Sequence, residues 1–157
     1  MATQILYMET TSIDATRTAG EISSALVRAG ATQIAMDYDA GRVKGLRWTM
    51  QLDGRDLLFA MPARCEPIYK ILRKRCRVPV PAGGQQERDM RLKAERVAWR
   101  QLLRWVQAQL AMIECGMTEA AEVFFPFTVH PETQQTFFQV FRERQQLALP
   151  PAEGKAQ

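Results

Sequence analysis

The sequence predicts an α+β protein in which an antiparallel sheet of about four strands, connected as a meander, packs on helices and is supported by a long C-terminal helix. Three observations lead to this prediction. Apolar and polar residues alternate along residues 33–61, which is the period of a half-buried strand. Turn residues interrupt the alternation at Asp39-Ala40-Gly41 and at Asp53-Gly54. A helical apolar pattern then extends from about Gln86 to Cys115.

The N-terminal part is expected to contain a short strand and one helix. The pattern of residues 4–9 predicts the strand. Thr18 and Glu21 form a T-x-x-E capping box, in which each side chain satisfies a free backbone N–H of the first helical turn. Gly30 suits the left-handed conformation that often follows a helix. The apolar face of this helix is Ile22, Ala25, Leu26 and Ala29.

The next three strands are expected to have one apolar face and one mostly polar face. The apolar face would carry Leu46, Trp48, Met50, Leu57, Phe59 and Met61. The polar side chains expected to project outward are Lys44, Arg47, Thr49, Gln51 and Arg55. Exposed aromatic rings are needed to stack bases on such a face, and only Tyr7, Tyr38 and Tyr69 are candidates.

Helices are expected to complete a single domain over residues 1–147, followed by a flexible tail over residues 148–157. Glu66-Pro67 begins one helix, since proline is tolerated in the first turn. A loop rich in proline and glycine leads to the long helix. Phe124–Phe127 is expected to dock on the core. A last helix over Thr136–Gln145 would turn inward Phe137, Phe138 and Phe141.

Composition places the chain among intracellular globular proteins. It has 157 residues, of which 46% are hydrophobic and 24% are charged, the usual globular balance. No apolar run approaches the ~20 residues that span a membrane, and no secretory signal is evident. Cys65, Cys76 and Cys115 are an odd, widely spaced set, which favours a reducing cytoplasm over a disulfide framework.

No catalytic or cofactor motif is recognisable, so we expect no enzyme activity, no cofactor and no metal. His130 is the only histidine, and no C-x-x-C pair or phosphate-binding glycine motif is present. One alternative stays open. Asp37 and Asp39, with Asp53 and Asp56 nearby, could hold Mg²⁺ as in a metal-dependent nuclease, although Asp-x-Asp beside a glycine is also ordinary turn chemistry.

Positive charge is concentrated in the middle of the chain. Residues 64–104 contain twelve Lys or Arg and four Asp or Glu, a net +8, whereas the whole chain carries only +4. Such asymmetry points to a polyanionic partner, although a long helix also commonly has a solvated charged face. The candidate nucleic-acid contacts, which would neutralise phosphates, are Lys44, Arg47, Arg73, Lys74, Arg75, Arg77, Arg88, Arg91 and Arg96.

Four segments resemble a family of small, uncharacterised proteins of bacteriophages and mobile elements. They are Ala29–Tyr38, Glu95–Leu110, Glu114–Met117 and Phe124–Phe127, and the likeness covers roughly residues 20 to 130. The resemblance implies a role in DNA replication, recombination or counter-defence, and it carries over no catalytic residue. In element order alone, the chain is also similar to single-strand-binding folds of the transcriptional-coactivator and Whirly type.

The expected function is non-enzymatic binding of nucleic acid, with single-stranded DNA favoured, in the replication or recombination of a phage or mobile element. One alternative is a protein-interaction module, an inhibitor or adaptor of a host protein, that presents the same basic surface to an acidic partner. The other is the metal-dependent nuclease. A homo-oligomer is also expected to be possible, because the Phe-rich C-terminal segment and the tryptophans offer surplus apolar surface.

Overall fold

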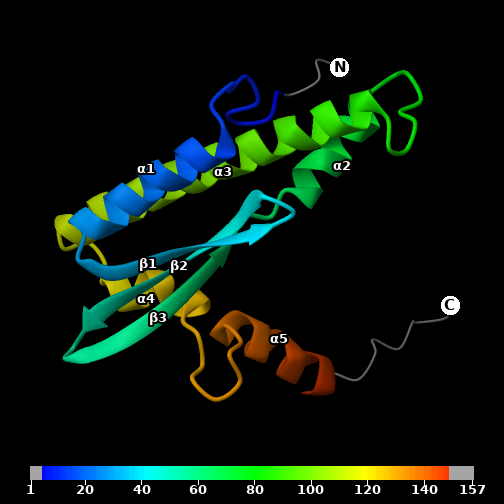
Figure 1. The fold of residues 1–157 in the computed structure, drawn as a ribbon. Coiled ribbons are helices and arrows are strands. Elements are labelled where there is room, and N and C mark those ends of the chain that lie inside the picture. The colour runs from blue at the N-terminus through cyan, green and yellow to red at the C-terminus, as the bar shows by residue number, and fades with distance from the viewer. Residues whose placement is uncertain (1–4, 149–157) are drawn as a thin grey trace, which may run out of the picture.

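A computed structural model describes residues 5–148 and confirms the α+β class and the long helix (Figure 1). The expected tail from residue 149 lies outside the described residues. The elements in chain order are α1 (Ala15–Arg28), β1 (Ala31–Asp39), β2 (Arg42–Leu52), β3 (Arg55–Pro62), α2 (Glu66–Arg75), α3 (Gln85–Glu114), α4 (Ala120–Phe124), the 3₁₀ helix η1 (Phe125–Phe127) and α5 (Phe137–Ala148).

Helix α1 begins earlier than the predicted capping box. Asp14 is the N-cap, because its Oδ1 accepts the Thr16 N–H at 2.8 Å. Thr18 is 0% exposed inside the helix, and its hydroxyl donates to the Asp14 carbonyl at 3.2 Å. The T-x-x-E prediction was therefore wrong. The glycine after the helix was predicted correctly, since Gly30 has a φ of 104°.

The three strands form an antiparallel sheet in the order β1-β2-β3, which is the predicted meander. Both connecting turns place two successive residues at positive φ, as a type I′ hairpin turn requires. The values are 47° and 74° for Ala40 and Gly41, and 51° and 75° for Asp53 and Gly54. The two turns thereby fix which side chains of β2 face the helices.

The sheet has three strands among the described residues, and not about four. The segment expected as a first strand forms a turn instead, because Leu6 and Glu9 pair with each other. The Glu9 Oε2 accepts the Leu6 N–H at 2.7 Å, and the Glu9 N–H donates to the Leu6 carbonyl at 3.0 Å. On the outer edge of β3, the Val129 N–H donates to the Leu58 carbonyl at 2.7 Å, which pairs that edge only locally.

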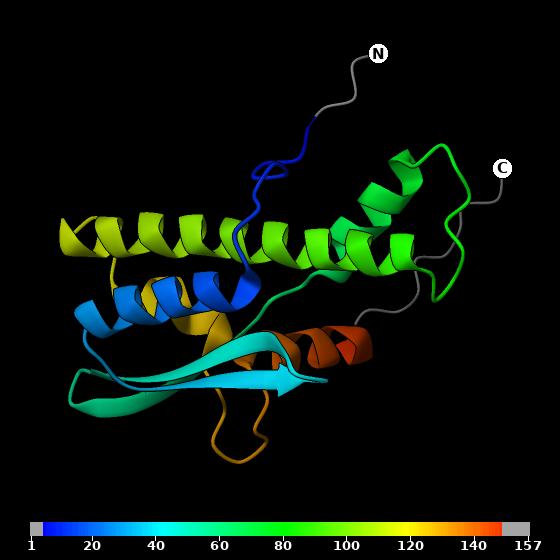
Figure 2. The same cartoon turned by 45° about the horizontal axis from the view of Figure 1, so that its top comes forward.

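Helices α1 and α3 lie side by side over one face of the sheet (Figures 1 and 2). The aromatic core lies between these layers. Trp48 of β2 and Phe59 of β3 stack with ring centroids 5.2 Å apart, and Phe124 of α4 meets Trp48 edge-on at 5.4 Å. Trp99 of α3 is also fully buried. The predicted apolar face of the sheet is confirmed by this packing.

Helix α2 packs on the first half of α3, which starts one residue before the predicted Gln86. Tyr69 of α2 is buried in this contact and is not the exposed ring that the sequence suggested. The members of the small core between the two helices are Ile68, Tyr69, Leu72, Ala94, Val97 and Ala98. This contact brings the N-terminal turns of both helices beside β2, where the candidate site lies.

The inward orientation predicted for the phenylalanines of α5 was wrong for two of the three. Phe141 is 56% exposed and Phe138 is 37% exposed, whereas Phe137 is partly buried and stacks on Phe125 at 4.8 Å. The cause is that α5 packs mainly on the short η1 segment, which is too small to cover a whole helix face. Apolar surface is therefore left open around α5.

Candidate nucleic-acid interface

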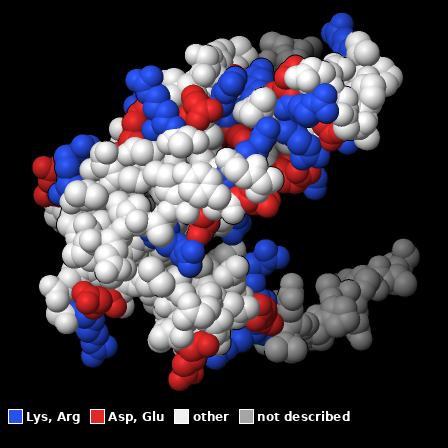
Figure 3. Space-filling view, viewed as in Figure 1, with Lys and Arg blue, Asp and Glu red and all other residues white. Residues whose placement is uncertain are grey.

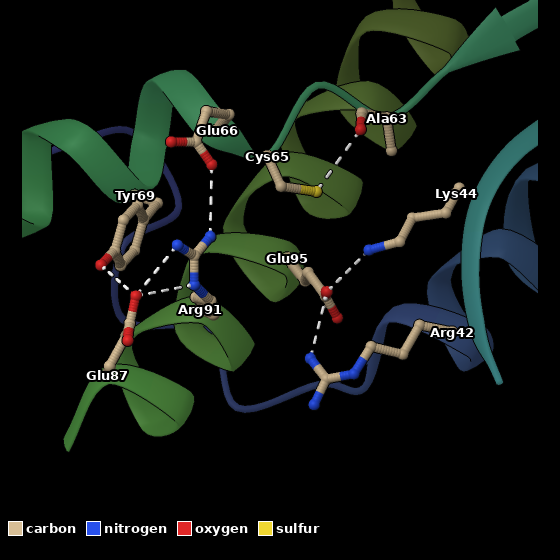
Figure 4. A network of polar contacts seen from close by, with 9 residues as sticks. All are labelled: Arg42, Lys44, Ala63, Cys65, Glu66, Tyr69, Glu87, Arg91 and Glu95. Atoms are coloured by element: carbon tan, nitrogen blue, oxygen red, sulfur yellow. Dashed lines mark hydrogen bonds and ion pairs between the residues drawn. The ribbon is translucent and has the colours of Figure 1, made fainter. Parts of the chain in front are cut away.

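A charged pocket of about 380 Å³ lies where β2 and the first turns of α2 and α3 meet (Figure 4). Four cations line it, and three of them belong to the predicted nucleic-acid contacts. The charged lining residues are Arg42, Lys44, Arg88, Arg91, Glu66 and Glu95. The structure thus brings Lys44 of β2 to Arg88 and Arg91 of α3, more than 40 positions away in the sequence, around one concavity.

Glu95 organises the wall formed by β2. The residue is only 7% exposed, and its Oε1 accepts hydrogen bonds from Arg42 Nη1 at 3.1 Å and Lys44 Nζ at 3.2 Å. Arg42 and Lys44 are two positions apart on β2, and both side chains reach the same carboxylate oxygen. A buried carboxylate needs such partners, because leaving it unpaired would cost several kcal/mol. Glu95 therefore holds two half-exposed cations at the mouth of the pocket.

The opposite wall is a closed ion-pair cluster around Arg91. Its guanidinium lies 4.0 Å from the centre of the Tyr69 ring and donates to Glu66 Oε2 at 3.3 Å and to Glu87 Oε1 at 3.0 Å. The Tyr69 hydroxyl also donates to Glu87 Oε1, at 2.9 Å. Both acids compete with any anionic ligand for Arg91, so this residue is a wall of the pocket and not a free phosphate contact.

Glu87 is the most strongly stabilised carboxylate of the cluster. The Gly83 N–H donates to its Oε2 at 2.6 Å, and this bond is the main reason that its pKa falls to about 2. The hydroxyl of Tyr69 and the guanidinium of Arg91 lower the pKa further. Glu87 therefore ties the loop before α3 to α2 at neutral pH.

Arg88 is the third open cation of the pocket. It donates to the Gly83 carbonyl at 2.8 Å and to Gln85 Oε1 at 3.2 Å, both neutral acceptors. No carboxylate of residues 5–148 forms an ion pair with Arg88. The guanidinium is exposed and keeps its full charge available for an anion.

Cys65 lies in the pocket lining but offers no nucleophile at neutral pH. Burial raises the pKa of its thiol to about 11, and the negative charge of Glu95 acts in the same direction. The Sγ donates to the Ala63 carbonyl at 3.4 Å, which is a contact of the thiol form. The pocket therefore offers Arg and Lys donors, which can bind an anion, and no reactive thiolate.

No family model, curated protein or solved structure matches this chain. The resemblance to proteins of phages and mobile elements therefore stays a prediction. Within the described range, no helix combines the length and the apolarity that crossing a membrane demands.

Three further predicted contacts are exposed along α2 and just beyond its end. Arg73, Lys74 and Arg77 are exposed, and no acid within residues 5–148 forms an ion pair with them. Arg75 lies between them in sequence but is turned toward the N-terminal turn, where it pairs with Glu9 at 2.9 Å. The free cations of this region therefore form a short strip and not a continuous sleeve around the helix.

The polar face of the sheet does not form the predicted basic platform. Lys44 lies on the helix side of the sheet with Glu95, so the prediction that it projects outward with Arg47 was wrong. The pairing of β1 with β2 shifts register here, from Asp37 opposite Gly45 to Tyr38 opposite Val43, so Lys44 is an extra residue of β2. Its Nζ donates to Glu95 on the helix side. Arg47 does lie on the outer side, where it pairs with Asp37 of β1.

Three further cations of α3, at positions 93, 96 and 100, do not join the charged pocket. Lys93 pairs with Glu9 at 3.4 Å, and the buried Arg100 pairs with Glu21 of α1 at 3.0 Å. Arg96 is partly buried, and its Nε has no hydrogen-bond partner among the described residues. Figure 3 accordingly shows Lys and Arg gathered over α2 and the start of α3, with Asp and Glu interspersed.

Sequence reasoning missed two residues that define the pocket, Arg42 and Glu95. A signal for Glu95 was present, because it precedes Trp99 by four positions and Leu103 by eight. It therefore lies on the buried stripe of α3, where a carboxylate requires a cationic partner. Arg42 and Lys44 were the matching signal on β2, since they are two positions apart on one strand.

The alternative metal site is not assembled among residues 5–148. No group of three His, Cys, Asp or Glu side chains converges there in a way that could hold a metal ion. Asp37 forms an ion pair with Arg47, so its carboxylate is already engaged. Asp37, Tyr38 and Asp39 pair with Gly45, Val43 and Arg42, so the register shift at this point places its extra residue in β2 and not in β1.

Two largely apolar cavities lie beside α5. One, of about 840 Å³, separates α5 from β3 and α3 and is lined by Trp105, Phe127 and Phe138 among others. The second, of about 730 Å³, lies between η1 and α5 and is lined by Phe125 and Phe141. Their lining suits an apolar protein segment better than a phosphate backbone.

Proposed function

We propose that this chain is a non-enzymatic nucleic-acid-binding protein that contacts single-stranded DNA through the charged pocket and the adjoining strip of α2. The observation that carries the proposal is the convergence of Arg42, Lys44 and Arg88 on one concavity. Two distant parts of the sequence supply these cations, β2 and the start of α3, and a solvated charged helix face alone would not require that convergence.

The strip on α2 leads away from the pocket. Glu66 lines the pocket, and Lys70 and Arg73 follow it by four and seven positions, which places them on the same side of the helix. Lys74 and Arg77 continue the exposed positive charge. A strand whose phosphates follow this line would gain affinity by releasing counterions from its backbone.

A single strand fits this geometry better than a duplex. The pocket holds only about 380 Å³ between β2, α2 and α3, so an unpaired, flexible backbone can bend into it, whereas a duplex would contact only its rim. The contacts are phosphate contacts and imply little sequence preference. A place in replication or recombination of a phage or mobile element is proposed from the sequence resemblance alone.

Salt-dependent binding to labelled oligonucleotides tests the proposal. Each phosphate contact on a single strand contributes roughly 0.7 to the slope of log K against log salt. For the variant Arg73→Ala/Lys74→Ala/Arg77→Ala, which removes three such contacts, we expect the magnitude of the slope to fall by about 2. Arg28→Ala/Arg55→Ala/Arg104→Ala is the matched control, because it removes the same charge from exposed sites elsewhere. Undetectable binding at about 50 mM salt would overturn the proposal.

A protein-interaction module is the second candidate function. It is favoured by the exposed rings of Phe125 and Phe141, which line the cavity of about 730 Å³ beside α5. Sedimentation of the full chain over a range of concentrations tests whether this surface associates with another copy. Association that Phe125→Ser/Phe141→Ser abolishes would support an interface. A monomer whose solubility the substitutions leave unchanged would argue against it.

A further inference from the structure

We propose that the charged pocket binds a terminal phosphate of a nucleic-acid strand, with Arg42, Lys44 and Arg88 as donors and Glu95 as the residue that positions two of them. The inference rests on the proposed function, because it specifies which group of the nucleic acid enters this pocket. It adds a preference for phosphorylated strand ends, which phosphate neutralisation along α2 would not produce.

The three cations keep hydrogen-bond donors open. Arg42 uses one guanidinium nitrogen for Glu95 and Lys44 uses one of its three N–H groups, and neither side chain forms another hydrogen bond among residues 5–148. Each side chain is 39% exposed. Arg88 binds only neutral acceptors. A phosphate has several acceptor oxygens, and charge-assisted bonds to them are among the strongest hydrogen bonds in proteins.

Arg42 and Lys44 are held in place before any ligand binds. An exposed arginine or lysine loses much side-chain entropy when it closes on an anion. Glu95 has already fixed Arg42 and Lys44 on one side of the pocket, so part of that entropy is lost on folding and not on binding. Glu95 itself is buried beneath the two cations, and its Oε1 accepts a hydrogen bond from each of them.

The net charge of the pocket matches that of a terminal phosphate. Arg42, Lys44 and Arg88 with Glu95 sum to +2, and a terminal phosphate carries about −1.5 to −2 at neutral pH. The Arg91 cluster on the far wall, with Glu66 and Glu87, sums to −1 and is internally paired. That wall discourages a second phosphate. The pocket thus suits one end group and not a chain of phosphodiesters that passes through.

The size of the pocket also suits a single end group. It holds about 380 Å³ and is lined on the α3 side by Ala94 and Glu95, both buried residues. A terminal phosphate in this pocket would leave the following phosphates free to lie along the exposed cations of α2.

Fluorescence anisotropy of the full chain with single-stranded oligonucleotides of about 12 nucleotides tests the inference. The probes are identical in sequence and carry a 5′ phosphate, a 3′ phosphate or no terminal phosphate, each labelled at the opposite end. We expect one phosphorylated probe to bind about tenfold more tightly than the hydroxyl probe. The 5′ and 3′ arms show which end is taken.

Arg42→Gln and Arg88→Gln should each reduce this preference to less than about threefold while binding of the hydroxyl probe persists. Arg55→Gln, an exposed arginine of the β2–β3 hairpin, is the matched control and should keep the preference. Arg88 makes no ion pair with any described residue, so its variant tests the site even where Arg42→Gln lowers stability. Glu95→Gln should weaken the preference without removing a donor, as expected of a positioning residue.

The outcomes separate the two proposals. Binding that is salt-dependent but indifferent to the terminal phosphate overturns the end pocket and leaves nucleic-acid binding standing. A preference that survives Arg42→Gln and Arg88→Gln also overturns the pocket assignment. Failure of every probe to bind at about 50 mM salt overturns nucleic-acid binding itself. A preference lost in the pocket variants and retained in Arg55→Gln supports the inference.

Discussion

Glu95 and Arg42 are 53 positions apart in the sequence, yet Glu95 Oε1 accepts a hydrogen bond from Arg42 Nη1 at 3.1 Å. The bond joins the face of β2 to the first half of α3 across the edge of the core. Lys44 binds the same oxygen, so one buried carboxylate links two cations of one strand to the long helix. This contact creates the charged pocket and also makes it part of the stability of the fold.

Glu95→Gln is therefore expected to destabilise the protein. Breaking a fully buried ion pair typically costs 3–5 kcal/mol, but Arg42 and Lys44 remain in contact with solvent, so about 1–3 kcal/mol is expected. Urea unfolding at neutral pH measures the loss. Glu114→Gln, at the exposed end of α3, should change stability by less than about 0.5 kcal/mol. Equal stabilities for the two variants would show that the Glu95 contact contributes little.

Local signals carried most of the fold prediction. The alternation in β2 and β3 and the turn at Asp53-Gly54 are encoded within a few residues, so the meander followed directly from them. The failures depended on tertiary context. The Glu9 carboxylate accepts the backbone N–H of Leu6, which forms a turn in place of a first strand. Phe141 is exposed because α5 packs mainly on the short η1 segment.

The site was predicted only in part, for a related reason. A count of basic residues located Lys44, Arg88 and Arg91, because charge density is visible in the sequence. It could not separate Arg88, which forms no ion pair among residues 5–148, from Lys93 or Arg100, which have similar surroundings in the sequence but pair with distant acids. Which cation meets which carboxylate is decided by packing between α1, α3 and the N-terminal turn, and no local pattern encodes it.

Removing the N-cap of α1 should lower stability by about 1 kcal/mol, the usual cost of replacing an aspartate cap by alanine. Asp14→Ala deletes the carboxylate that accepts the Thr16 N–H, and the freed N–H must then rely on water. Ser12→Ala, two positions earlier and also exposed, is the control and should change stability by less than about 0.5 kcal/mol. Equal thermal midpoints for the two variants would contradict the assignment of Asp14 as the cap.

Alkylation should distinguish Cys65 from Cys115. The pKa of Cys65 is raised to about 11, chiefly by burial, so little of the reactive thiolate exists at about pH 8. Cys115 is exposed at the end of α3. Mass spectrometry after brief treatment with iodoacetamide should find Cys115 modified well before Cys65. Glu95→Gln removes a negative neighbour and should speed the reaction of Cys65, whereas equal wild-type rates at both cysteines would refute the prediction.

The titration of Glu87 gives the stability a defined dependence on acid. Its folded-state pKa is lowered from 4.5 to about 2, first by the Gly83 N–H and then by Tyr69 and Arg91. A carboxylate with a depressed pKa stabilises the folded state above its unfolded pKa, and this contribution is lost as the pH falls. The advantage of the wild type over Glu87→Gln should therefore be constant above about pH 5 and should shrink between pH 4.5 and about 2.

Carbon-13 NMR of the Glu87 carboxyl measures the same effect directly. Tyr69→Phe removes one hydrogen-bond donor but keeps the ring beneath Arg91, so the pKa of Glu87 should rise while the fold persists. Tyr38→Phe removes a hydroxyl that is exposed on β1 and should leave the titration unchanged. A Glu87 carboxyl that titrates near 4.5 in the wild type would mean that the Gly83 contact does not hold in solution, and the wall opposite Arg42 would then lack the rigidity that the pocket requires.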